Sequence, residues 1–415
     1  MLTQAPLAAP RRLLVPASFA DPWDFAPKSA WYWDDAATGL RFAAWGGGIV
    51  VRGALERRFE RARAWCSSAI EQWRGATAED LPAALLAFSF DERVSNADPT
   101  WRNWPRAYLW IPRFIAFSWP GRDPERGLLV LGGSERPQPA LRVAVRPAGF
   151  RRPQHAGEKE RYLGDVRKIV NDIEQGRLDK VVLARRVEVQ SAENARFDTE
   201  STVRALRGTV CFALPRGEAT FMGATPEVLA RVEGGSLETH ALAGTAARGG
   251  GVLASDKNVH EHRLVLDTLV GRLDALCTGV DVGRPRVTAA RDIEHIDVAL
   301  RGRLRSGVGL LDAAALLHPT PALAGAPTDA ALDWLRANEP FDRGYYGGLV
   351  GWLAPSGDGV LAVGIRSALV MRRRALLFAG AGIVAGSEPE AEWNETESKL
   401  GTMLQALRAV AEEQP

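Results

Sequence analysis

The chain contains the stretch Phe378-Ala-Gly-Ala-Gly-Ile-Val-Ala-Gly-Ser-Glu-Pro-Glu-Ala-Glu-Trp-Asn-Glu-Thr-Glu-Ser-Lys-Leu400, which predicts an apolar strand, a glycine-rich turn and a helix. Ser387 and Glu390 fit a capping box, in which a serine hydroxyl and a glutamate three residues later accept hydrogen bonds from each other's backbone amides. Pro389 suits the first helical position, where no amide hydrogen is needed. The stretch therefore predicts a strand that leads directly into a capped helix.

One face of this predicted helix combines two carboxylates with an amine. A helix advances about 100° per residue, so Glu392, Glu395 and Lys399 fall within about 60° of one another. The face borders an apolar stripe made of Trp393, Leu400, Met403, Leu407 and Val410. It is either a solvated face with a weakly stabilising Glu395–Lys399 pair, or the edge of a polar site beside a buried surface. The helix alone leaves both interpretations open.

The composition is that of an ordinary globular protein. The chain has 415 residues, 46% of them hydrophobic, and a net charge of +2. That charge predicts neither a nucleic-acid partner nor binding to an anionic membrane. Cys66, Cys211 and Cys277 are too few and too scattered for a disulfide framework or a zinc site. Since the N-terminal residues lack a signal-peptide pattern and no segment is apolar enough to span a membrane, we expect a soluble cytoplasmic protein.

Lysine is rare in this chain. Of the 52 basic residues, all but six are arginines. Arginine in practice keeps its proton, whereas a desolvated lysine can lose it, so a lysine near carboxylates or apolar residues is a candidate functional group. The six are Lys28, Lys159, Lys168, Lys180, Lys257 and Lys399.

Residues 1–150 predict a β-rich, tryptophan-rich part of the protein. They hold ten of the 13 tryptophans, and short apolar runs alternate with Gly, Pro and Asp clusters, as is typical of strands and turns. Glu56 to Trp73 predicts a helix. Trp101 to Trp110 mixes aromatic residues with arginines, as some nucleic-acid grooves do, but the balanced overall charge favours aromatic packing in a core. Pro147 to Gly157 is the predicted boundary to the rest of the chain.

A helix and a strand follow this boundary. Glu158 to Glu174 carries an apolar stripe and ends before Gly176, which suits a helix stop. Asp179 to Val189 begins with continuous apolar residues, which favours a strand buried on both faces. Lys180 lies at its buried start. It either extends its ammonium to the surface or gives up its proton and acts as a base.

Two further candidates lie on a predicted turn and after a predicted hairpin. Phe221 to Leu242 predicts a strand, a turn and a hairpin bent at Gly234-Gly235. Glu227 follows Thr-Pro at the turn, where carboxylates are common. Gly244-Thr245 follows the hairpin, and its glycine would allow the backbone to approach a ligand closely.

A helix predicted from Asp256 to Leu276 carries His260-Glu261-His262. This is not the His-Glu-x-x-His zinc motif, because position 264 is leucine. Glu261 borders the apolar stripe of the helix. It is therefore either a solvated glutamate or another carboxylate at the edge of a polar site.

The remaining segments are predicted to be turns and strands. His318 to Gly325 predicts a rigid turn, and Phe341 to Trp352 is too rich in glycine and aromatic residues for a plain helix. Two strands, Val360–Met371 and Arg374–Ala379, lead into the quoted stretch. Arg366 lies in an apolar run of the first strand and needs an anion, which is either a structural carboxylate or a ligand.

Together these elements resemble the chorismate-utilising enzymes, and most closely the isochorismate synthases of menaquinone and siderophore biosynthesis. The resemblance covers about residues 158 to 412 in order and matches the first 150 residues only loosely. It is carried by Lys180-Val-Val-Leu-Ala-Arg185, Thr225-Pro-Glu227, Ala243-Gly-Thr245, His260-Glu-His262, His318-Pro-Thr-Pro-Ala-Leu-Ala-Gly325, Phe341-Asp-Arg-Gly-Tyr-Tyr346 and the quoted stretch.

The resemblance implies an α+β fold in which two large, mostly antiparallel β-sheets pack together with helices outside. Residues 1–150 would complete the same compact unit, and residues 151–415 would form the chorismate-binding catalytic region. This expectation replaces the two or three domains that length alone suggests.

The resemblance also implies an isomerase that moves the hydroxyl group of chorismate. In isochorismate synthases water attacks C2 of the ring and the C4 hydroxyl leaves. Lys180 matches the family's base, and Glu227 matches the acid that protonates the leaving group. Glu261, Glu392 and Glu395 match the residues that hold a Mg²⁺ ion.

The residues implied to bind the substrate are Gly244, Thr245, His295, Ala322, Leu323, Tyr346, Arg366, Gly382 and Lys399. Salicylate synthases, which carry isochorismate on to salicylate and pyruvate, have a Thr-Ala-like pair where this chain has Ala322 and Leu323. They also have an acidic residue where this chain has Asn258, which implies weaker support of the metal here. We therefore expect the reaction to stop at isochorismate.

Two alternative functions fit parts of the sequence. Anthranilate and aminodeoxychorismate synthases use ammonia, usually from a glutaminase partner, but lysine at position 180 argues against the anthranilate branch. A nucleotide-binding protein is suggested by Gly380-x-Gly382-x-x-x-Gly386, although the third glycine is one position late for a dinucleotide-binding fingerprint. We expect chorismate as the small-molecule partner and a monomer with no obligatory protein partner.

Overall fold

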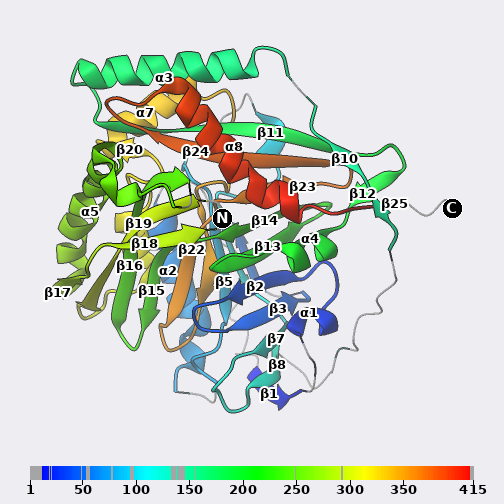
Figure 1. Ribbon diagram of the computed structural model, residues 1–415. Coiled ribbons are helices and arrows are strands. Elements are labelled where there is room, and N and C mark those ends of the chain that lie inside the picture. Colours follow the sequence, from blue (N-terminus) through cyan, green and yellow to red (C-terminus); the bar gives the residue numbers. More distant parts are fainter. Residues whose placement is uncertain are drawn as a thin grey trace.

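The computed structural model describes residues 12–411, except residues 18, 20, 48, 53–56, 76–77, 94–97, 132–136, 138–144, 154, 248 and 291–292. Within the described residues, two large sheets lie at the centre and helices lie outside them (Figure 1). Every strand pair in these two sheets is antiparallel. The α+β fold of two packed antiparallel sheets predicted from the sequence is confirmed.

The order of the strands across each sheet differs from their order in the sequence. From one edge to the other, the first sheet consists of β1 (Arg12–Pro16), β8 (Arg126–Leu131), β7 (Phe114–Ser118), β3 (Arg41–Trp45), β2 (Trp31–Asp35), β13 (Val210–Arg216), β14 (Ala219–Thr225), β23 (Ser367–Val370), β24 (Arg374–Ile383), β11 (Lys180–Ser191) and β10 (Phe150–Arg151), with β20 (Gly325–Ala326) also on β11. The second sheet consists of β17 (Cys277–Val282), β19 (Ile293–Leu304), β16 (Ser236–Ala247), β15 (Val228–Glu233), β22 (Gly359–Val363), β21 (Leu349–Leu353), β5 (Ala84–Phe88), β6 (Ala107–Ile111) and β4 (Ile49–Arg52), with β18 (Arg286–Ala290) also on β19. A small third sheet consists of β12 (Ala195–Phe197), β25 (Ala409–Ala411) and β9 (Pro147–Ala148).

The helices cover the outer faces of the two large sheets. They are α1 (Pro22–Phe25), α2 (Arg58–Ile70), α3 (Glu158–Glu174), α4 (Thr199–Ala205), α5 (Asp256–Leu276), α6 (Leu310–Leu317), α7 (Thr328–Asn338) and α8 (Pro389–Ala406), with short 3₁₀ turns at Glu71–Trp73, Pro99–Trp101 and Val252–Ala254. Figure 1 shows α8 crossing over β24, α3 lying beside α8 and β11, and α5 standing beside β16 and β19. The predicted helices Glu158–Glu174 and Asp256–Leu276 have these same bounds in the structure.

Alternating side chains of each central strand enter different cores. On β5, Leu85 and Ala87 belong to the core between the two sheets, whereas Leu86 and Phe88 belong to the core beneath α2, α5 and α6. This is the period of two expected for a strand that is buried on both faces. Strands from before residue 132 and strands from after residue 179 lie side by side in both sheets. The division of the chain at about residue 150 stays a prediction.

The strand predicted from Val360 to Met371 is wrong, because the structure breaks it at Arg366. β22 ends at Val363 in the second sheet, and β23 begins at Ser367 in the first. Arg366 has a φ of 49°, in the left-handed region that an arginine rarely adopts. Apolar periodicity cannot reveal such a break, because the residues on both sides of it are buried.

The predicted capping box of α8 is also wrong. The helix begins at Pro389, so the N-cap is Glu388, which makes no side-chain cap hydrogen bond. Ser387 lies one residue too early, and its hydroxyl instead accepts a hydrogen bond from the Val384 amide at 3.1 Å. The apolar stripe also ends sooner than predicted, since Val410 lies in β25.

The aromatic and arginine-rich segment from Trp101 to Trp110 packs in the core. Trp101 and Trp104 are buried between the sheets. Arg106 forms a buried ion pair with Asp342, which includes an Nη1–Oδ1 hydrogen bond of 3.0 Å. Asp342 also accepts a hydrogen bond from the Gly344 amide at 2.8 Å. The pair joins the N-terminal part of the chain to the turn that carries Tyr346. Separately, none of the described helices is both long and apolar enough to cross a membrane.

We expect Asp342→Asn to destabilise the protein by about 3 kcal/mol, because it leaves the buried Arg106 guanidinium without an ionised partner. The matched control is Asp267→Asn, which breaks the Arg263–Asp267 pair on the surface of α5, where the two side chains are 78% and 68% exposed. That change should alter stability by less than about 0.5 kcal/mol. Urea unfolding measures both, and equal effects of the two substitutions would contradict the assigned role of the buried pair.

Candidate active site

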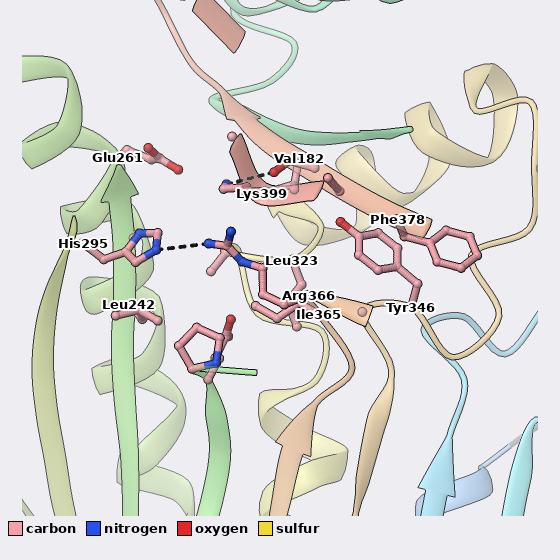
Figure 2. Close-up of a pocket in the computed structure, with 18 of the residues that line it drawn as sticks. Val182, Leu242, Glu261, His295, Leu323, Tyr346, Ile365, Arg366, Phe378 and Lys399 are labelled. Atoms are coloured by element: carbon pink, nitrogen blue, oxygen red, sulfur yellow. Dashed lines mark hydrogen bonds between the residues drawn. The ribbon is translucent and has the colours of Figure 1, made fainter. Parts of the chain in front are cut away.

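Both sheets, α5 and α8 contribute residues to one pocket. Among the residues that line it are Glu227, Gly244, Glu261, His295, Ala322, Leu323, Arg343, Tyr346, Arg366, Gly380, Gly382 and Lys399. Figure 2 shows His295 and Arg366 facing each other, with Glu261 and Lys399 directed toward the same space. The pocket therefore gathers side chains from positions as far apart in the sequence as Glu227 and Lys399.

Glu261, which lines this pocket, forms an ion pair with a buried lysine behind it. Lys180 begins β11 and is fully buried, and its Nζ lies 2.8 Å from Oε1 of Glu261 on α5. Its ammonium makes no well-directed hydrogen bond within the described part of the chain, so charge attraction dominates the contact. Burial raises the pKa of Glu261, but Lys180 and two further lysines outweigh burial and hold that pKa below its usual value. The sequence-based alternative of a lysine that extends to the surface is excluded.

Gly382 on β24 makes room for this ion pair. A β-carbon at position 382 would lie 2.2 Å from Oε1 of Glu261 and 2.9 Å from Cε of Lys180. Gly244 lines the pocket and also lies close to α5. It has a φ of 72°, and a β-carbon there would lie 2.7 Å from the backbone oxygen of Asn258. Glycine at this position therefore lets the strand approach α5, and its contact with a ligand stays a prediction.

Glu227 lies in the turn between β14 and β15 and is almost completely buried. Its backbone is fixed by two hydrogen bonds, from its own amide to Thr225 Oγ1 at 3.1 Å and from the Val363 amide to its carbonyl at 3.0 Å. Burial raises the pKa of Glu227 to about 7, although nearby cations act in the opposite direction. A carboxyl group with this pKa can hold a proton near neutral pH and donate it.

Arg366 presents a buried guanidinium to the pocket. Its Nη2 donates to Nε2 of His295 at 3.3 Å, and Nδ1 of His295 donates to the Gly244 carbonyl at 3.3 Å. Burial and the charge of Arg366 lower the pKa of His295 to about 3, so the ring is neutral and can accept this hydrogen bond. Among the described residues, no carboxylate lies within ion-pair distance of Arg366. Of the two partners expected from the sequence, a ligand anion is therefore favoured over a structural carboxylate.

Lys399 and Tyr346 both lie near Gly380 of β24 and line the pocket. Lys399 Nζ donates to the Gly380 carbonyl at 2.9 Å and to Glu395 Oε1 at 2.6 Å, which confirms the predicted pair on α8. Tyr346 stacks on Phe378 with the ring centroids 5.2 Å apart, and burial raises its pKa to about 12, so its hydroxyl stays protonated. Both groups can therefore donate hydrogen bonds to an anion in the pocket.

Ala322 and Leu323 lie together in the lining, on the turn that follows α6. The Leu323 carbonyl accepts a hydrogen bond from Nη1 of Arg343 at 2.9 Å. Arg343 also donates to the Val182 carbonyl at 2.6 Å and pairs with Glu339. This buried arginine, which was not predicted as a site residue from the sequence, ties the turn to β11.

The three glutamates that match the family's metal ligands are each paired with a lysine. Glu261 pairs with Lys180, Glu395 with Lys399, and Glu392 with Lys257 on α5. In their present positions, the described Asp, Glu, His and Cys side chains do not form any group of three that could bind one metal ion. The chemistry of the donors nevertheless fits Mg²⁺, which prefers carboxylate oxygens.

One predicted site residue, Thr245, has no described side chain, and one residue at the site, Lys257, was not among the predicted site residues. Thr245 lies opposite His295 in the register of β16 and β19, but its side chain lies outside the described residues. The sequence singles out Lys257 only as one of six lysines and does not indicate its ion pair with Glu392. The rarity of lysine in this chain is the one feature of the sequence that points to a role for Lys257.

Comparison with known proteins identifies the family. The chain matches the model of the chorismate binding enzymes over residues 142–408. The protein belongs to the chorismate-binding enzyme family. This confirms the family predicted from the sequence. Because β24 pairs antiparallel with β11 on one side and with β23 on the other, the alternative of a dinucleotide-binding β-α-β unit, which needs parallel strands, is excluded.

Two relatives and one solved structure show how far the similarity extends. The chain is 33% identical to the salicylate biosynthesis isochorismate synthase of Pseudomonas aeruginosa, over 97% of this chain and 92% of that protein. It is 34% identical to the isochorismate synthase DhbC of Bacillus subtilis, over 60% of this chain and 68% of that protein. The structure of MenF, the menaquinone-specific isochorismate synthase from Escherichia coli, matches 98% of this chain and 96% of its own with a TM-score of 0.76 and 25% identity.

We expect Gly382→Ala to reduce kcat/KM for chorismate by about a hundredfold or more, because a β-carbon would push Lys180 and Glu261 apart. Gly164→Ala is the matched control, since a β-carbon at that position on α3 has no neighbour within 4 Å. The control should keep its activity and a folded circular-dichroism spectrum. A fully active Gly382→Ala enzyme would show that the close approach at position 382 has no catalytic importance.

Proposed function

We propose that the protein is an isochorismate synthase, an isomerase that converts chorismate to isochorismate with Mg²⁺. The observation that carries this proposal is a pocket lined by Glu227, a buried glutamate whose pKa is raised, and by Glu261, which forms an ion pair with the buried Lys180. Lys180 is fully buried and Glu227 has a pKa of about 7, which suits a base and an acid that work in the same reaction. A protein that only binds a ligand would need neither group.

The substrate is a dicarboxylate, and the pocket offers suitable donors. Arg366 has no carboxylate partner among the described residues, so it can bind the pyruvyl carboxylate of chorismate. Tyr346 and the backbone at Gly382 would complete this contact, with Lys399 close by. Gly244, Thr245 and His295 would lie along the ring. Burial strengthens each of these contacts, because water competes less in a low-dielectric site.

The reaction exchanges one hydroxyl group for another. Lys180, as the neutral amine, takes a proton from a water molecule, and the oxygen of that water forms a bond to C2 of the ring. The bond between C4 and its hydroxyl breaks, and Glu227 supplies the proton with which this group leaves as water. The proton then returns from Lys180 to Glu227, so the enzyme and the total number of atoms are unchanged.

Glu261, Glu392 and Glu395 are the residues that would hold Mg²⁺, which would bind the ring carboxylate of the substrate and neutralise its charge. In this structure the ion pair with Glu261 holds the Lys180 ammonium in place. Glu261 therefore has to release Lys180 before that side chain can act as a base. Asn258 is buried on α5, three residues before Glu261. Salicylate synthases have an acidic residue at this position, whereas asparagine adds no further carboxylate here.

We further propose that the reaction stops at isochorismate. Loss of pyruvate would require the enolpyruvyl arm to fold over the ring, and Leu323 is a bulky, buried residue at the pocket. Ala322 has no hydroxyl group that could hold the folded arm. Action in the cytoplasm, as a monomer without an obligatory protein partner, completes this proposal.

Purified protein with chorismate and Mg²⁺ should form isochorismate without an equivalent of pyruvate, as separated by chromatography. Lys180→Arg should be nearly inactive although it keeps the positive charge, because guanidinium does not give up its proton near neutral pH. Lys168→Arg, at a lysine that is 63% exposed on α3, is the control and should remain active. Stoichiometric salicylate and pyruvate, or a fully active Lys180→Arg enzyme, would contradict the proposal.

The rate should depend on pH through Glu227. The acid must carry its proton, and its pKa of about 7 lies within the accessible range. Loss of this proton should lower kcat/KM about tenfold for each pH unit above that value, wherever Lys180 is already a neutral amine. Steady-state rates of the unsubstituted enzyme and of Glu227→Gln, in overlapping buffers at constant ionic strength, measure this dependence. Glu227→Gln has no carboxyl proton to donate at any pH, so a Glu227→Gln enzyme with an unchanged rate and pH profile would exclude Glu227 as the acid.

A further inference from the structure

Lys257 places an ammonium group among the proposed metal ligands. It lies one helical turn before Glu261 on α5 and forms an ion pair with Glu392 on α8. The Glu392 side chain is 1% exposed, whereas the Lys257 side chain is 32% exposed. Burying a carboxylate without a partner is strongly unfavourable, so Glu392 needs this cation or another one.

The position of Lys257 in its helix supports a specific role. It is the second residue of α5, and the N-terminal end of a helix carries partial positive charge that disfavours a lysine. Lysine is also rare in this chain. The contact with Glu392, which lies 135 residues later, therefore gives a reason for this residue type here.

The charge of Lys257 acts on all three glutamates. Burial alone would lower the pKa of Lys257, but Glu392, Glu395 and Glu261 together raise it above its usual value. Burial and the negative charge of Glu395 raise the pKa of Glu392 above its usual value, and the positive charge of Lys257 partly offsets this increase. One ammonium thus offsets negative charge contributed by two different helices.

Of the three lysines paired with these glutamates, Lys257 is the one whose side chain can move away from its carboxylate partner. Lys180 is fully buried, and the Lys399 side chain is 16% exposed and anchored to the Gly380 carbonyl. Lys257 does not line the substrate pocket, and its partly exposed side chain can turn into solvent without leaving a cavity.

We propose that Lys257 is a resident cation that Mg²⁺ has to displace: its ammonium neutralises Glu392 when no metal is bound and competes with the metal for that carboxylate. This inference rests on the proposed function, which assigns Mg²⁺ to Glu261, Glu392 and Glu395. Its consequence is that the protein remains folded without metal but binds Mg²⁺ more weakly than the three carboxylates alone would.

The test is calorimetric titration of Mg²⁺ alone into chelator-treated protein. Lys257→Met removes the charge while keeping most of the side-chain length, and it should lower the Kd for Mg²⁺ by about tenfold or more. Lys257→Arg keeps a cation and should bind Mg²⁺ no more tightly than the unsubstituted protein. The matched control is Lys159→Met, which breaks a 2.7 Å pair with Glu390 on the solvent side of α8 and should leave the Kd unchanged.

Thermal unfolding gives a second measurement that does not depend on activity. In chelator, Lys257→Met should unfold at a temperature a few degrees lower, because Glu392 loses its partner. Added Mg²⁺ should raise its Tm by more than it raises that of the unsubstituted protein. If Lys257→Met does not fold without metal, the affinity is measured by titrating chelator into protein purified with Mg²⁺.

The outcomes separate this inference from the proposed function. An unchanged or weaker Mg²⁺ affinity in Lys257→Met overturns the proposal that Lys257 competes with Mg²⁺, but it leaves the assignment of the three glutamates as metal ligands intact. If the unsubstituted protein and Lys257→Met both fail to bind Mg²⁺, the metal assignment falls and the inference falls with it. Tighter binding in Lys257→Met but not in Lys159→Met supports the competition.

Discussion

The ion pair between Lys180 and Glu261 is the constraint around which the site is built. Two opposite charges, one on β11 and one on α5, are buried 2.8 Å apart, and such a pair is tolerated only where each charge keeps its partner. The absence of a β-carbon at Gly382 makes room for the pair. Gly244 brings β16 against α5, which positions Glu261. The architecture of two packed sheets with helices outside thus holds a few charged side chains close together at one pocket.

The charges of the site are nearly balanced before any ligand binds. Three glutamates are matched by three lysines in pairs that join α5 to β11, α5 to α8, and successive turns of α8. A dianionic substrate and a divalent cation together add no net charge to this arrangement. Arg366 donates a hydrogen bond to neutral His295 and has no carboxylate ion-pair partner in the described part of the chain, so it is the positive charge in excess and the proposed site for an anion. Burial raises the pKa of Glu227 to about 7, which suits the proposed role as the proton donor to the leaving group.

Much of the fold and the set of candidate residues could be predicted from the sequence, because Lys180, Glu227 and the Glu392–Glu395 helix lie in short local motifs. The family and the antiparallel α+β fold followed from them. What could not be predicted depends on contacts across long separations. Lys257 meets Glu392 only because α5 packs near α8, and Arg343 reaches the Leu323 carbonyl across a turn. The break at Arg366 is invisible to hydrophobic periodicity, because buried residues flank it on both sides.

The most direct test of the proposed chemistry follows the oxygen atom. Chorismate is converted by the protein in water enriched in ¹⁸O, and the isochorismate formed is analysed by mass spectrometry with fragmentation. If Lys180 activates water and Glu227 protonates the departing C4 hydroxyl, the new hydroxyl at C2 carries the heavy isotope from the solvent and C4 carries no oxygen. Isochorismate whose C2 hydroxyl retains the isotope composition of the original C4 hydroxyl would contradict this mechanism, because it would show transfer within the substrate instead of attack by water.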